Sequence, residues 1–445
     1  MSAGLSPEAR AAYAVGFERA LAQQEDLPWF ASARRDAFDA FVQQGWPTTK
    51  HEDWRFTDVS PLTRLALLPA PVKPVAGDGT FDESLLNLGR GLGHRMVFVD
   101  GRHDGGQRAG LPLSAGLVVA PLALAVRDEA GKVGAAFGQQ LHNQNAFVSL
   151  NTAFTTDGVF IGIPTGLVVE APIFVVFLAC AESAVSLPRT LVVAGADSQA
   201  TVVEVHLGAE GRATFSDAVT EILLEPGSRL AYHGIVRPSS HGSHVGHLAV
   251  TQNTGSTFSA HGLSLDGRLV RNDAHVLLAG ENCTCQLDGI YLAAGGSHID
   301  NHTSIDHRAP RSTSREHYKG VVAGRGQAVW TGRAMVRPGA QGTDARQTNR
   351  NLILDDGAVV HAKPHLEIFA NDVKCSHGAT TGRLDPEALF YLRSRGIGEK
   401  EANHILISAF LREGLGHVTN APLRGELEAI LAARTRDLAV QGATP

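Results

Sequence analysis

The segment Cys375-Ser376-His377-Gly378 carries the clearest chemistry in the sequence. In a β-strand, side chains two positions apart point to the same side, so the Cys375 thiol and the His377 imidazole would emerge together. Both groups are ligands of transition metals and iron–sulfur clusters. A cluster needs about four protein ligands, so these two residues would share it with a partner chain. Lys374 would lower the pKa of the thiol. The alternative is a buried cysteine beside a turn histidine.

Other metal-ligating residues are better explained as structural. Cys283 and Cys285 would place two small sulfur side chains on one face of a strand, which suits a buried interior. Histidines and acidic residues also gather at His233, His241, His244, His247, 300–302 and 306–307. Turn and surface positions explain such residues more often than a metal site does. The sequence contains no P-loop, no dinucleotide-binding glycine motif followed by a helix and no Ser-His-Asp order.

The segment that must position these residues is rich in short β-branched runs and turn glycines. The glycines are Gly195, Gly227, Gly255, Gly280, Gly326 and Gly357, several of them followed by a second glycine. Their spacing lies in the range of about 20–50 residues that marks a solenoid, and no helical periodicity accompanies it. We therefore expect a β-helix, with the strands of successive coils about 4.8 Å apart. A β-sandwich is the alternative, although few two-residue hairpin turns support it.

Helical signals flank this segment on both sides. Ser6 is suited to the N-cap of a helix and Pro7 to its first position. Asp385 and Pro386 are suited to the same two positions of a second helix. Further helices are expected over 30–44, before Gly45, and over 422–438. An apolar stripe on another C-terminal helix consists of Ala402, Ile405, Leu406, Ala409 and Phe410, before Gly414. We expect the terminal helical domains to cover the open ends of the β-helix, where strand edges would otherwise remain unpaired.

These signals divide the chain into four parts. Residues 1–95 form an N-terminal helical domain with a Pro/Gly-rich linker over 69–80. Residues 96–158 form a mixed α/β connecting segment. Residues 159–384 form the parallel β-helix core, and 385–445 form the C-terminal helical domain.

Composition limits the possible function. The 445 residues are 43% hydrophobic and 19% charged, as in soluble globular proteins. A net charge of −6 does not indicate the basic surface that nucleic-acid binding requires. The longest apolar stretch, 167–181, is broken by Glu170 and Pro172 and is too short for a membrane span. Four cysteines and the absence of a secretory signal indicate the reducing cytoplasm.

Three long segments, 346–354, 364–380 and 390–397, closely match a known family, and weaker matches occur at 163–172, 300–307 and 314–320. On these segments the chain resembles the SufB/SufD family of iron–sulfur assembly scaffolds. The resemblance covers nearly the whole chain and is least distinctive over 70–150. Trp46-Pro47 and the segment 52–57 are similar to SufD-type rather than SufB-type members. Asn371 departs from the aspartate that is common in the family, but Asp372 follows it.

The resemblance implies a right-handed parallel β-helix between helical domains and a non-catalytic scaffold role. Members of the SufD type pair with SufB through their β-helices and bind the SufC ATPase through the C-terminal helical domain. The resemblance assigns His377 to a site for iron or a nascent cluster shared with a SufB cysteine, with Cys375 in the same motif. Reduced flavin is associated with the whole complex, but no flavin motif is found in this sequence. A homodimer of the isolated chain is a further expectation.

Two other functions remain as alternatives. A β-helix carbohydrate-active enzyme is usually secreted and lines its cleft with aromatic residues, which are only 6% of this chain. A SufB-type scaffold subunit would carry a larger set of cysteines, often including a CxxC group.

Overall fold

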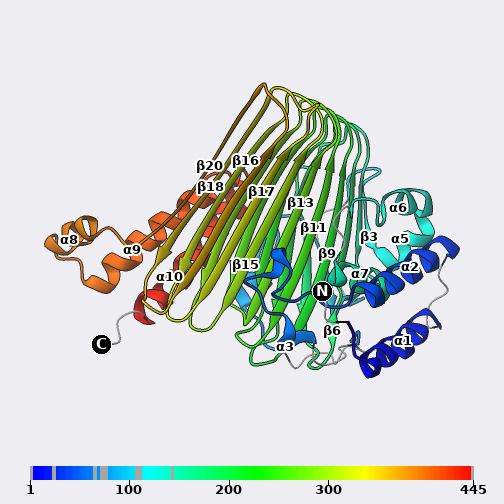
Figure 1. Ribbon diagram of the computed structural model, residues 1–445, viewed down its shortest axis with the longest axis horizontal. Helices are drawn as coiled ribbons and strands as arrows, with labels where there is room; N and C mark the ends of the chain where they lie inside the picture. The colour runs from blue at the N-terminus through cyan, green and yellow to red at the C-terminus, as the bar shows by residue number, and fades with distance from the viewer. Residues whose placement is uncertain are drawn as a thin grey trace.

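The computed structural model describes residues 4–22, 27–63, 68–70, 79–105, 113–141 and 145–441. Figure 1 shows a long stack of strands, with the N-terminal helices beside its early coils and the C-terminal helices beside its late ones. The linker expected over 69–80 falls largely on 71–78, outside the described residues. None of the helices described is long and apolar enough to cross a membrane.

The stack is a parallel β-solenoid built from two ten-stranded sheets. The first sheet contains, in spatial order, β2 (Arg102–His103), β1 (His94–Val99), β5 (Ile173–Ala179), β8 (Gln199–Gly208), β10 (Arg229–Arg237), β12 (Thr257–Leu265), β14 (Thr284–Ala293), β16 (Thr313–Val322), β18 (Thr343–Ile353) and β20 (Val373–Gly382). The second contains β19 (Val359–Ile368), β17 (Gln327–Val336), β15 (His298–His307), β13 (Leu269–Leu278), β11 (Ser243–Gln252), β9 (Phe215–Leu224), β7 (Arg189–Ala194), β4 (Val159–Ile163) and β3 (Val118–Pro121), with β6 (Val185–Ser186) beside β9.

Each coil adds one strand to each sheet, and the register is regular. Arg229 pairs with Thr257, which pairs with Thr284, which pairs with Thr313. All strand pairs among the described residues are parallel except β1 with β2 and β3 with β4. The prediction of a β-helix is therefore confirmed, and the alternative of a β-sandwich is wrong.

The glycines of the repeat have two different roles. Gly227 and Gly255 occupy turns with φ of 72° and 70°, a conformation that favours glycine. By contrast, Gly234, Gly262 and Gly289 lie within strands and pair in register. A Cβ on Gly289 would lie 2.1 Å from the Tyr318 ring. The second glycine of this repeat therefore makes room for an aromatic ring in the solenoid interior instead of forming a turn.

Most of the N-terminal helices pack on the outer face of the second sheet, whereas the short helix over 83–86 packs on β8 of the first sheet. They are α1 (Pro7–Ala22), α2 (Pro28–Gln44), η1 (Glu52–Trp54), α3 (Ser60–Thr63), α4 (Glu83–Leu86), α5 (Leu122–Asp128), α6 (Ala130–Ala136) and α7 (Ala146–Phe154). The expected start at Pro7 and the end before Gly45 are confirmed, whereas α2 starts at Pro28, two residues before its expected start. Aromatic side chains of α1, α2 and α7 share one core with Phe215 of β9. Buried Arg189 on β7 pairs with Glu221 on β9, whose carboxylate also accepts the Gly138 N–H at 3.0 Å.

The segment 51–57 is a docking element. Thr57 donates a hydrogen bond to buried Asp300 at 2.5 Å, and the Arg271 guanidinium lies 3.7 Å from the centre of the Trp54 ring. Arg271 also pairs with Asp300 at 2.7 Å. Asp300, in the segment 300–302 that offered possible metal ligands, therefore binds the N-terminal segment to the solenoid instead.

The C-terminal helices are α8 (Pro386–Ser394), α9 (Glu399–Arg412), η2 (Glu413–Leu415) and α10 (Ala421–Gln441). They pack against outward-facing residues of the first sheet, including Ile290 and Val321. The expectation that they cover the end of the solenoid is wrong, because β20 is almost wholly exposed. Within the part of the chain that the structure describes, the last coil is therefore uncapped.

The buried face of α9 also differs from the predicted stripe. Ala402, Ile407 and Leu411 are buried, whereas Ile405 is 36% exposed and Ala409 is exposed. Apolar residues occur on more than one face of α9, so their periodicity alone cannot predict which face packs on α10 and the solenoid.

Candidate functional site

Cys375 and His377 lie on β20, the final strand of the first sheet. Cys375 pairs in register with Ala345, and His377 pairs with Gln347, both of which are buried in the interior. Cys375 packs against a small apolar cluster that includes Val336 and Ala370, so its side chain faces inward. By strand alternation His377 faces the same way, but on an uncapped coil that leaves it exposed.

The Cys375 thiol is not activated in the way that the sequence suggested. Partial burial raises the pKa of the thiol, and the nearby Asp344 carboxylate raises it further. The expected lowering by Lys374 is wrong, because adjacent residues of a strand point to opposite sides. Cys375 is therefore a weak thiolate donor in the free chain, which leaves His377 as the better ligand of the two.

His377 is held by no hydrogen bond or ion pair among the residues that the structure describes. Among the described residues, neither His377 nor Cys375 belongs to a group of three side chains that could hold a metal ion. The two side chains thus offer at most a partial ligand set. Their role as metal ligands stays a prediction.

A polar column leads from His377 into the solenoid. Below it, Gln347 donates a hydrogen bond at 2.9 Å to Glu316, which is in register with it on β16. The Thr303 hydroxyl donates to the other carboxylate oxygen of Glu316. Burial raises the pKa of Glu316 to about 7, despite these two hydrogen bonds. The interior next to the open end therefore holds a carboxyl group that titrates near neutral pH.

Sequence reasoning missed this column. Gln347 lies in the segment 346–354, which carried part of the resemblance, but its alternating polar residues gave no indication of which side faces inward. Glu316 is an isolated glutamate in the sequence. Its burial follows from solenoid register, which no local pattern reveals.

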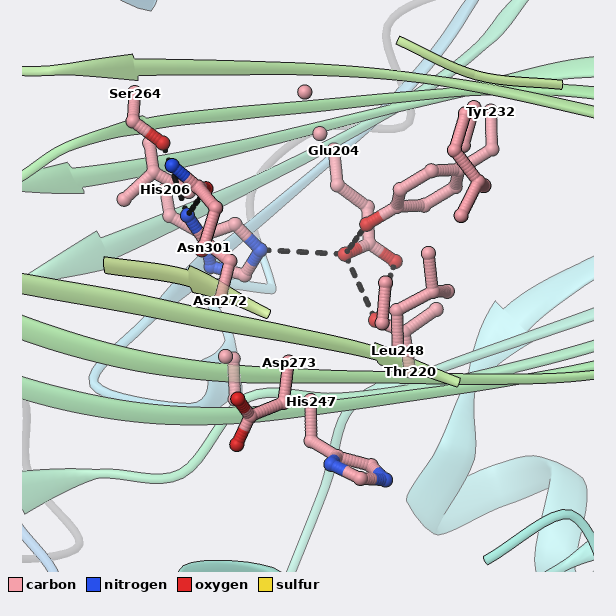
Figure 2. A pocket seen from close by; sticks show the side chains of 18 of the residues that line it. Glu204, His206, Thr220, Tyr232, His247, Leu248, Ser264, Asn272, Asp273 and Asn301 are labelled. Carbon is pink, nitrogen blue, oxygen red and sulfur yellow. Dashed lines mark hydrogen bonds and ion pairs between the residues drawn. The ribbon is translucent and has the colours of Figure 1, made fainter. Parts of the chain in front are cut away.

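A polar cavity lies deeper in the solenoid, with a volume of about 90 Å³. Figure 2 shows Glu204 at its centre, approached by Thr220, Tyr232 and His206. The donor–acceptor distances to the Glu204 carboxylate are 3.0 Å from Thr220, 2.9 Å from Tyr232 and 3.2 Å from His206. This carboxylate is already satisfied, so the volume is best explained as room for a few waters.

The remaining cysteines and histidines behave as structural residues. Cys283 and Cys285 are each 1% exposed, as expected for the solenoid interior. The histidines of the segment 233–247 do not converge on one site, because each contacts a different histidine outside it: His233 stacks on His261, His244 lies beside His206, and His247 lies beside His275. Burial lowers the pKa of both His233 and His247 to about 3, so these rings are neutral.

Comparison with known proteins supports the resemblance seen in the sequence. Residues 177–410 match the family model described as SUF system FeS cluster assembly, SufBD core domain, and 13–175 match the SufBD protein N-terminal region. The chain is 28% identical over 428 residues to an iron–sulfur cluster assembly SufBD family protein of Synechocystis, covering 94% of each chain.

Two further relatives carry the names SufD and SufB. SufD of Escherichia coli is 28% identical over 388 residues, covering 84% of this chain and 85% of that protein. SufB of Bacillus subtilis is 28% identical over 272 residues, covering 60% of this chain and 58% of that protein. Because the core-domain model alone matches more than half of its residues, the chain belongs to the SufBD family of iron–sulfur cluster assembly proteins.

Proposed function

We propose that this chain is a SufD-type scaffold subunit of a cytoplasmic complex with SufB and SufC, with no catalytic step of its own. The SufD relative matches 84% of the chain, against 60% for the SufB relative, which supports the SufD type over the SufB type. The observation that carries the proposal is the uncapped last coil. It combines two unpaired strand edges with an exposed histidine.

SufB joins this chain at the last coil. Strands β19 and β20 end their sheets, so each offers unpaired backbone N–H and C=O groups to another chain. Ile368 and Phe369 beside this edge are 42% and 58% exposed, which gives a partner apolar surface to bury. A strand-to-strand junction with a second β-helix would pair these edges.

His377 then binds iron or a nascent iron–sulfur cluster together with a cysteine of SufB. Imidazole nitrogen and thiolate sulfur are both established iron ligands, and His377 has no competing partner among the described residues. Cys375 is the secondary ligand, because burial raises the pKa of its thiol. Iron is cargo at this site, and reduced flavin, if the complex uses it, has no residues assigned on this chain.

SufC docks on the C-terminal helices. No residue of α8 is buried, and Phe390 and Tyr391 on it are 73% and 57% exposed. Ile405 on α9 adds a third exposed apolar side chain. Large apolar residues exposed together on a helical hairpin mark a protein interaction surface. Phe390→Ala combined with Tyr391→Ala should abolish co-purification with SufC and leave the SufB pairing intact.

The test of the metal site is His377→Ala, with His241→Ala as the control. His241 is also exposed but lies in the turn before β11, far along the stack from β20. Each variant is purified anaerobically in complex with SufB and SufC, and its iron and sulfide are measured. Because His377 is exposed, its loss should change stability by no more than about 0.5 kcal/mol.

The expected result is an intact three-subunit complex that has lost most of its iron and sulfide in His377→Ala alone. A His377→Ala complex with wild-type iron and sulfide would refute the site. A His377→Ala chain that no longer joins SufB would show that the histidine serves the interface, and would equally remove the ligand assignment.

A further inference from the structure

A second group of metal-ligating side chains lies on the outer face of the first sheet, away from the last coil. Asp288 projects from β14 and His317 from the neighbouring strand β16. His417 comes from the turn after η2, in the C-terminal domain. The Asp288 carboxylate oxygens lie 3.2 Å from His317 Nδ1 and 3.1 Å from His417 Nδ1. Three elements far apart in the sequence thus converge on one carboxylate.

The spacing of these donor atoms fits a metal ion. One ligand atom from each residue can be chosen so that all lie within 4.8 Å of one another. Imidazole nitrogen and carboxylate oxygen bind zinc at about 2.0–2.2 Å, which sets neighbouring ligands of a tetrahedral site roughly 3.3 Å apart. The two nitrogen–oxygen distances are already close to that spacing. An ion could therefore enter with small side-chain movements.

The surroundings supply the support that a metal site needs. Buried His261 has its Nε2 3.3 Å from Asp288 Oδ2, the oxygen that also faces His417, so a third imidazole lies beside the carboxylate. The Gln286 side-chain amide lies 2.6 Å from Asp288 and 2.9 Å from His317 Nδ1. Half a turn of this amide would direct its oxygen, a further potential ligand, toward the same point.

Access and rigidity are combined at this position. Asp288 is 3% exposed, whereas the His317 and His417 side chains are 41% and 54% exposed, so an ion can reach the carboxylate from solvent. Leu415 and Val418, on either side of His417, are buried against the solenoid. Lys319, next to Tyr318 on β16, donates to the Phe410 carbonyl at 3.0 Å. The turn that presents His417 is therefore fixed on the sheet.

We propose that Asp288, His317 and His417 form a binding site for a divalent transition-metal ion of the zinc and ferrous class. Two imidazoles and one carboxylate suit these ions, whereas calcium and magnesium require mostly oxygen ligands. Solvent or Gln286 completes the coordination. The bound ion clamps the C-terminal helices to the solenoid at the seam between β14, β16 and η2.

The experiment measures metal binding to the full-length chain in a Cys375→Ser/His377→Ala background, which removes the proposed cluster ligands. Zn²⁺ binding is followed by calorimetry and metal analysis after dialysis, and Co²⁺ is the spectroscopic probe. His417→Ala and His317→Ala are the test variants, because both side chains are partly exposed and should not be needed for folding. The matched control is His365→Ala, whose ring has one carboxylate neighbour among the described residues, Glu367 at 3.1 Å.

We expect about one equivalent of Zn²⁺, a Co²⁺ spectrum typical of nitrogen and oxygen ligands, and a higher melting temperature with metal. His417→Ala and His317→Ala should each weaken Zn²⁺ binding at least tenfold, and His365→Ala should leave it unchanged. The proposal is overturned if the background chain retains no metal, or if the His417 and His317 variants bind as tightly as it does. Either failure leaves the His377 proposal standing, because that site is absent from this experiment.

Discussion

Glu316 should make the stability of this protein depend on pH in an unusual direction. The carboxyl group is buried beneath the last coil, and burial raises its pKa from 4.5 to about 7. Between these two pH values the folded chain holds a proton that the unfolded chain has released. Stability therefore falls as pH rises through this window, and the loss is complete above the folded-state pKa.

The size of the effect follows from the shift. About 2.5 pKa units at 1.36 kcal/mol each correspond to about 3 kcal/mol. Glu316→Gln mimics the protonated carboxyl group, because its amide can accept from Gln347 and donate to the Thr303 hydroxyl. The variant should exceed the wild type by less than about 1 kcal/mol at pH 5 and by about 3 kcal/mol at pH 8. For 445 residues this corresponds to about 3 °C in melting temperature.

The assay is thermal unfolding of both proteins across this pH range, taken as the difference between variant and wild type. Glu18→Gln, which neutralises an exposed carboxylate on α1, controls for the general loss of one negative charge. A variant-minus-wild-type difference that is equal at pH 5 and pH 8 would contradict the reasoning, because Glu316 would then ionise alike in both states.

Three further outcomes follow from other parts of the fold. Gly320→Ala should lower stability by about 1–3 kcal/mol in thermal unfolding, because its Cβ would lie 2.0 Å from the Tyr291 ring, whereas Gly378→Ala on β20, with nothing within 4 Å, should have no effect. Glu221→Gln should cost about 3–5 kcal/mol in the same assay, because it leaves a buried guanidinium without its carboxylate; a neutral result would contradict this. In native protein, iodoacetamide at pH 7.5 should label Cys375 alone among the cysteines, as mass spectrometry can show. The reaction should be slower than that of iodoacetamide with free glutathione, because the pKa of the Cys375 thiol is raised.

Local chemistry made the helix starts predictable. Asp385 accepts the Glu387 N–H at 2.9 Å and Pro386 begins α8, as cap preferences require. The glycine spacing predicted the solenoid because each coil must turn at similar intervals. What the spacing could not show was that a glycine within a strand, such as Gly289, marks an interior ring from the next coil.

Features that depend on tertiary packing were not predictable. The orientation of α9 and the uncapped last coil are decided by where the C-terminal helices dock, which no local pattern encodes. The same holds for His417 and Asp288, which are separated by 129 residues and meet only because η2 packs on β14 and β16. The Cys375–His377 pair was found from sequence because two positions along one strand are a local relation.

The uncapped coil also bears on what the isolated chain can do with iron. Unpaired strand edges tend to pair with whatever edge is available, so a second copy of the chain could take the position that we propose for SufB. A two-fold pairing of identical edges would bring together only copies of the same residues. Those copies supply imidazoles and the Cys375 thiol, whose pKa is raised by burial, but no activated cysteine. Self-pairing would thus protect the edge without completing the proposed cluster site, which is why our proposal gives His377 a partner of another sequence.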